Sequence, residues 1–147
     1  MKLIGDEHIS PKIVKAVCEI ALNRAWTFEA ITKTSPYVAT EDEDWVVRFA
    51  KTGGNCVLSS DRNMLKRDTF IQKITQTDLI LIYMPADYAE GRRQYQAAKI
   101  LYWWPKIEIC IARSDPGRVW LVPKGMGGGD LREYTPKTQH TKIKRRP

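Results

Sequence analysis

The stretch CVLSSDRNMLKR, residues 56–67, begins as an apolar run and ends in charge. Its first residues are typical of a buried strand, and Asp61 follows directly after two serines. Three cations come next, at Arg62, Lys66 and Arg67. A carboxylate beside several cations is compatible with a plain surface turn, and equally with one corner of a metal site that faces a polyanion. The remainder of the chain has to distinguish these two interpretations.

Candidate strands and helices alternate along most of the chain. Strands are predicted at 2–5, 25–31, 55–60, 78–85, 107–112 and 118–123. Helices are predicted at 10–22, capped by Ser10 with Pro11 behind it, at 40–53, capped by Thr40, within 63–76, and at 86–103, with Pro105 as the stop. Strand–helix repetition of this kind favours an α/β fold, in which helices cover both faces of a mostly parallel sheet.

Acidic residues follow two of the predicted strands. Asp6 comes directly after the first strand and Asp61 after the third, and the acidic run 41–44 opens the helix between them. In sheets of this type the active crevice lies at the carboxyl ends of the strands. Carboxylate oxygens and water are the ligands that Mg²⁺ and Mn²⁺ prefer, so one interpretation is a metal site. The other is structural, because Asp often occupies turns and acids favour the first turn of a helix.

Composition limits the remaining classes. The 147 residues correspond to one domain, and the three cysteines are not spaced as a zinc site requires. No apolar stretch reaches the ~18 residues of a membrane span, so a cytoplasmic protein without membrane contact is expected. The net charge of +7 favours polyanionic partners. Residues 124–147 predict a basic, glycine-containing flexible tail, and the GMGGGD within it lacks the strand–turn–helix context of a dinucleotide site.

Three segments resemble the PIN-like domain family. MKLIGDEHISPKIVKAV (1–17) resembles the family's opening, a strand followed by Asp-Glu-Asn-Leu-Ser-Pro. TEDEDWVVRFAKTGGNCVLSSDRNM (40–64) resembles its second and third motifs, and AAKILYWWPKI (97–107) resembles a Trp-Pro-Ile segment of the VapC-type toxin ribonuclease branch. Each motif is short, but together they occur in the family's order and spacing over about residues 1–122.

The resemblance implies a PIN-like three-layer α/β/α fold over residues 1–123 and a metal-dependent endoribonuclease. Its catalytic residues would be Asp6, Asp42 and Asp61, which would bind Mg²⁺ or Mn²⁺. The acidic run leaves the middle ligand open: Asp42 fits the family's spacing to Trp45 best, and Glu43 is the next candidate. Asp42 and Asp44 are too far apart around a regular helix to face one ion together. Asn63 stands where many relatives have a second Asp, which leaves the number of ions open.

The resemblance also implies partners. RNA would be the substrate, a cognate antitoxin protein would be a partner, and a homodimer is left open. Arg62, Lys66 and Arg67 would then contact phosphates, although a solvated helix face explains each cation equally well. Two other functions have the same fold: a catalytically inactive RNA- or protein-binding module, and a structure-specific DNA nuclease. His8 and His140 are interpreted as bystanders.

Overall fold

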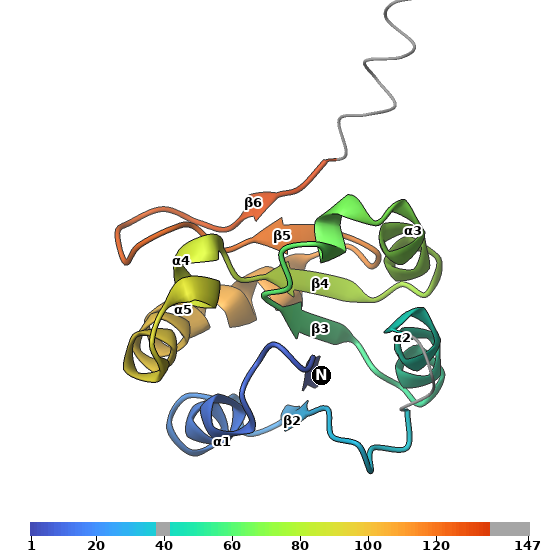
Figure 1. The fold of residues 1–147 in the computed structure, drawn as a ribbon, viewed down its shortest axis with the longest axis horizontal. Coiled ribbons are helices and arrows are strands. Elements are labelled where there is room, and N and C mark those ends of the chain that lie inside the picture. The colour runs from blue at the N-terminus through green and yellow to red at the C-terminus, as the bar shows by residue number, and fades with distance from the viewer. Residues whose placement is uncertain (38–41, 136–147) are drawn as a thin grey trace, which may run out of the picture.

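The computed structural model describes residues 1–37 and 42–135, without the side chains of residues 42–44. They form a six-stranded sheet in the order β2-β1-β3-β4-β5-β6, parallel except for β6, which is antiparallel to β5 (Figure 1). The elements are β1 (Lys2–Gly5), α1 (Pro11–Ile20), β2 (Thr27–Ala30), α2 (Asp42–Lys51), β3 (Cys56–Ser59), η1 (Met64–Lys66), α3 (Asp68–Gln76), β4 (Ile80–Tyr83), α4 (Ala86–Glu90), α5 (Arg93–Arg113), β5 (Val119–Leu121) and β6 (Arg132–Glu133).

Helices cover both faces of this sheet, which confirms the predicted three-layer fold. Helices α1 and α5 pack together on one face, and α2 and α3 on the other (Figure 1). Successive residues of a strand point to opposite faces, so Leu58 packs in the α1/α5 core while Val57 packs in the α2/α3 core. The central strands β3 and β4 are almost entirely apolar because both faces are covered by helices.

The direction of winding changes between β1 and β3. From β1 the chain crosses through α1 to β2 on one side, and then through α2 to β3 on the other side of β1. In open parallel sheets the crevice for a ligand forms at the carboxyl ends of the two strands where the winding reverses. In this protein that position lies just beyond Gly5 and Ser59.

Local signals in the sequence explain where the first helices begin and end. The Ser10 hydroxyl accepts a hydrogen bond from the Lys12 amide at 3.2 Å, and Pro11 occupies the first turn of α1. After α2 the chain turns at Gly53, whose φ of +93° is a left-handed conformation that favours glycine. Both features were predicted, whereas the predicted cap at Thr40 lies outside the described residues.

The prediction of a helix stopping before Pro105 and a strand at 107–112 was wrong. A short α4 is followed by α5, which continues through Pro105 to Arg113. Proline inside a helix costs about 3 kcal/mol or more, but burial at helical spacing outweighs that cost here. Ile107 and Ile111 are fully buried, while Ile109 between them is 51% exposed, which fits a helix and not an alternating strand.

The sequence predicted a flexible tail from Lys124 onward, but the chain remains folded beyond this residue. The Lys99 ammonium donates to the carbonyls of Pro123 and Gly125, both at 2.7 Å. Further along, Leu131 is buried and β6 pairs with β5. The folded part therefore includes residues 124–135, and the basic residues beyond them lie outside the described part.

No helix in the described part of the chain is both long enough and apolar enough to cross a membrane.

Candidate functional site

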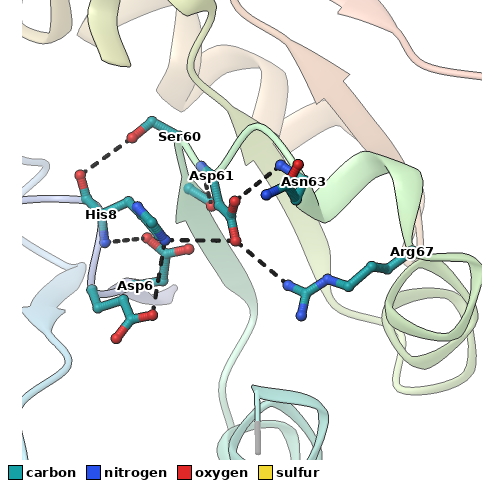
Figure 2. Close-up of polar contacts among 8 residues, drawn as sticks. Asp6, His8, Ser60, Asp61, Asn63 and Arg67 are labelled. Atoms are coloured by element: carbon teal, nitrogen blue, oxygen red, sulfur yellow. Dashed lines mark hydrogen bonds and ion pairs between the residues drawn. The ribbon is translucent and has the colours of Figure 1, made fainter. Parts of the chain in front are cut away.

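Asp6 occupies the end of β1 at the point where the winding reverses. Its amide donates to the Leu58 carbonyl at 3.0 Å, which continues the pairing of β1 with β3. Its Oδ1 accepts from the His8 amide at 2.9 Å (Figure 2). Its carboxylate also accepts from the Ser59 hydroxyl. Asp6 is only 4% exposed, and these hydrogen bonds hold its side chain in one orientation.

The environment of Asp6 disfavours its ionised form. Burial raises the pKa of Asp6 from 3.8 to about 6, and the negative charge of Asp61 acts in the same direction. Hydrogen bonds from Ser59 and the His8 amide, and the His8 side chain, lower this pKa by less. A carboxylate that is desolvated beside a second carboxylate is stabilised when a cation approaches.

Asp61 lies in the loop after β3, close enough to Asp6 for its charge to act on that carboxylate. Its amide donates to the Ser59 hydroxyl at 3.1 Å, so this hydroxyl links the two aspartates. Asp61 Oδ1 accepts from the Asn63 amide at 3.0 Å, a local turn of the kind that Asp favours. Asp61 Oδ2 lies 3.5 Å from both His8 Nε2 and the nearest guanidinium nitrogen of Arg67 (Figure 2).

His8 contacts more of this site than its interpretation as a bystander implied. Its amide holds Asp6, its ring approaches Asp61, and its carbonyl accepts from the Ser60 hydroxyl at 3.2 Å. Its position two residues after Asp6, in the loop that leaves the carboxyl end of β1, was the available signal. The strand register, which no local pattern specifies, sets these contacts.

The predicted middle ligand lies outside the side chains that the structure describes. Helix α2 begins at Asp42, but the side chains of Asp42, Glu43 and Asp44 are outside the described part. The helix ends only a few residues before β3, so its first turn is directed toward the opposite edge of the sheet, the edge of Asp6 and Asp61. Among the described residues no group of three or more His, Cys, Asp or Glu side chains is placed to hold a metal ion.

The three predicted phosphate-binding cations have different surroundings. Arg62 is exposed and forms an ion pair with Glu90 at the end of α4. Arg67 faces Asp61, and Lys66 is exposed on η1. All three lie between β3 and α3, on the segment that leaves the carboxyl end of β3 together with Asp61.

Comparison with known families decides what kind of domain carries this site. A family model described as a PIN like domain matches residues 1–86, which is more than half of the chain. The chain belongs to the PIN-like domain family. The matched part contains β1 to β4 and both aspartates, and it ends before α5. Neither the search of curated proteins nor the search of solved structures found a match.

Membership gives this domain a nuclease-type fold, and PIN-like domains are generally nucleases that use divalent metals. The described aspartates fit such an ion chemically. They offer hard oxygen ligands, and both are largely shielded from water, at 4% exposure for Asp6 and 16% for the side chain of Asp61. Their mutual repulsion is a cost that a divalent cation relieves.

Proposed function

We propose that this PIN-like domain is a metal-dependent endoribonuclease that hydrolyses phosphodiester bonds in RNA. The observation that carries the proposal is the meeting of Asp6 and Asp61 at the reversal point of the sheet, with the pKa of Asp6 raised to about 6 chiefly by burial. A buried carboxylate such as Asp6 has little structural value by itself, and the charge of Asp61 disfavours its ionised form further. A cation bound between the two carboxylates would offset this cost.

Asp6 and Asp61 would hold Mg²⁺ or Mn²⁺, with Asp42 or Glu43 as the third carboxylate and Asn63 as a neutral oxygen ligand. The chemistry that such an ion supplies when bound is activation of water and stabilisation of charge on the phosphate. The His8 amide and the Ser59 hydroxyl would keep the ligand oxygens oriented. Arg67 would pair with Asp61 from the other side, because its guanidinium lies 3.5 Å from Asp61 Oδ2.

Cations beside the aspartates support RNA as the polyanion. Arg62, Lys66 and Arg67 would contact phosphates that flank the cleaved bond, which adds affinity without sequence preference. The net charge of +7 would assist association with any nucleic acid. Preference for RNA over DNA would then depend on contacts near the 2′-hydroxyl.

We further propose that the protein is the toxin of a toxin–antitoxin pair and binds a cognate antitoxin protein. This proposal rests on the resemblance of residues 97–107 to the VapC-type segment, which lies outside the matched residues 1–86. Co-expression with the protein encoded by the neighbouring reading frame tests it. A stable complex that abolishes cleavage is expected, and free coexistence without inhibition would contradict it.

Cleavage assays on paired substrates test the nuclease proposal. Single-stranded RNA, single-stranded DNA of the same sequence and a branched DNA flap are each incubated with Mg²⁺, with Mn²⁺ and with EDTA. Cleavage of the RNA alone, only with metal, is expected. Preferred cleavage of the flap would establish a structure-specific DNA nuclease instead. Metal-independent RNA binding without any cleavage would establish an inactive binding module.

A further inference from the structure

Tyr83 ends β4 beside the two aspartates, and neither the family resemblance nor the sequence motifs assign it a role. It pairs in register with Ser59, whose hydroxyl contacts both Asp6 and Asp61. Alternation along β4 places Tyr83 on the face of Leu81, which packs in the α2/α3 core. Paired residues of neighbouring parallel strands share a face, so Tyr83 borders the carboxylate pair on its β4 side.

The electrostatic surroundings of Tyr83 place its hydroxyl near the same charges. Burial raises the pKa of Tyr83, Asp61 raises it further, Arg62 lowers it and Asp6 raises it slightly. The phenol therefore stays protonated at neutral pH and can donate a hydrogen bond. The side chain is half-buried, and its hydroxyl has no hydrogen-bond partner within residues 1–37 and 42–135.

A donor in this position suits a phosphate. Phosphodiester oxygens bound near the carboxylates need neutral or positive donors around them, and tyrosine hydroxyls are common phosphate contacts. Arg62 lies within electrostatic reach of Tyr83, and its ion pair with Glu90 anchors it to the end of α4. Tyr83 and Arg62 together offer one neutral donor and one cation near the two carboxylates.

We infer that Tyr83 is a substrate-contacting residue whose hydroxyl donates a hydrogen bond to a phosphate oxygen of the RNA backbone beside Asp6 and Asp61. This inference rests on the proposed function and extends it to the β4 side of the site. A contact to phosphate positions the RNA and does not read its sequence. This contact does not require the aromatic ring of Tyr83 to stack on a base.

Substitution of the hydroxyl alone tests the inference. Tyr83→Phe keeps the ring, and Tyr83→Leu removes it. Tyr102→Phe is the matched control, since the Tyr102 hydroxyl donates to the Gly127 carbonyl from an exposed position on α5. Affinity for a short single-stranded RNA is measured by fluorescence anisotropy in EDTA, and kcat/KM is measured with Mn²⁺. Tyr83→Phe is expected to weaken both about tenfold, the effect of one hydrogen bond to a charged acceptor. Tyr83→Leu should lose no more than a further ~twofold, and Tyr102→Phe should match wild type.

The outcomes separate the inference from the proposed function. A wild-type protein that cleaves RNA together with an equally active Tyr83→Phe overturns the inference alone. A wild-type protein that binds RNA without cleaving it overturns the nuclease proposal, while anisotropy still decides the role of Tyr83; absence of RNA binding overturns both. Calorimetry with Mn²⁺ should give the same affinity for Tyr83→Phe and wild type. A weaker metal affinity would assign the hydroxyl to the metal site and contradict the phosphate contact.

Discussion

Asp6 and Asp87 show how one domain can place two carboxylates in opposite electrostatic conditions. Burial would raise the pKa of Asp87 too, but hydrogen bonds from Tyr95, Gly125 and Lys99, together with the ammonium charge, lower it to about 2. Three donors converge on its Oδ2: the Tyr95 hydroxyl at 2.6 Å, the Gly125 amide at 3.0 Å and the Lys99 ammonium at 3.1 Å. The pKa of Asp6 instead rises to about 6.

The difference separates a carboxylate that holds the fold together from one that weakens it. Lys99 is fully buried, and its three contacts fasten the segment after β5 to α4 and α5. Asp6 has a second carboxylate as its neighbour and no ammonium or guanidinium within ion-pair distance among the described residues. Groups at functional sites often retain such unfavourable pKa shifts because the function requires them.

Loss of a site carboxylate should have the largest effect. Asp61→Asn keeps the size of the side chain and removes its charge, so cleavage of RNA should fall at least ~1000-fold while the fold stays intact. Single-turnover cleavage and far-ultraviolet circular dichroism measure the two properties. Asp115→Asn, in the turn before β5, is the matched control and should cleave normally. Equal activity of Asp61→Asn and wild type would reject the site.

Loss of the buried ammonium should mainly reduce stability. Lys99→Met removes the buried ammonium beside Asp87 and leaves the Pro123 carbonyl without its donor. This loss should lower the free energy of unfolding by about 3 kcal/mol. Urea denaturation measures this difference. Lys106→Met is the comparison, because Lys106 pairs with the 93% exposed Asp130, and it should cost less than about 1 kcal/mol. Equal losses for the two variants would show that burial of Lys99 does not matter.

The raised pKa of Asp6 should make stability depend on pH. The folded protein holds this proton up to about pH 6, while the ordinary pKa is 3.8. The contribution of this group to stability is therefore greatest below pH 4 and declines as the pH rises through 6, by about 3 kcal/mol in full and by about 2 kcal/mol between pH 4.5 and pH 7.5. Urea unfolding in EDTA at pH 4.5 and pH 7.5 compares wild type with Asp6→Asn. The decline should be smaller in the variant, and the same decline in both would contradict the shift.

Asp87 should show the opposite dependence in a lower window. Its folded pKa of about 2 lies below the ordinary 3.8, so its contribution is present above pH 4 and is lost as the pH falls toward 2. Acid unfolding should consequently start at higher pH in Asp87→Asn than in wild type. Coincident acid transitions would show that the Lys99 contact does not stabilise the ionised form.

Removal of a surface cation should have the smallest effect. Lys66→Gln should weaken RNA binding about threefold to fivefold for all sequences alike, and should reduce the slope of affinity against salt by about one. Lys15→Gln, on the outer side of α1, is the control and should leave both quantities unchanged. If Lys15→Gln weakens binding as much as Lys66→Gln does, RNA is not localised near η1.

The sequence was informative wherever a local rule and the packing agree. Apolar runs, the Ser10 cap and the left-handed Gly53 predicted β1, α1, α2 and β3. The placement of Asp6 and Asp61 at one edge followed from the geometry of parallel sheets. These inferences need only the order of the elements, because parallel neighbours bring their carboxyl ends together.

The sequence was uninformative where distant contacts decide. Pro105 predicts a helix end, yet burial of α5 against the sheet keeps the helix continuous. Nothing near Lys99 indicates that it is buried, because its carbonyl partners are 24 and 26 residues away. The contacts of His8 and the position of Tyr83 likewise depend on the register between strands.

Calorimetric titration with Mn²⁺ tests most directly whether Asp6 and Asp61 form one cation site. Wild type should bind Mn²⁺ saturably, and Asp6→Asn and Asp61→Asn should each lose most of the affinity, since each removes one of the two carboxylates. Asp115→Asn should bind as wild type does. Absence of saturable binding in wild type, or equal binding by all four proteins, would contradict the account.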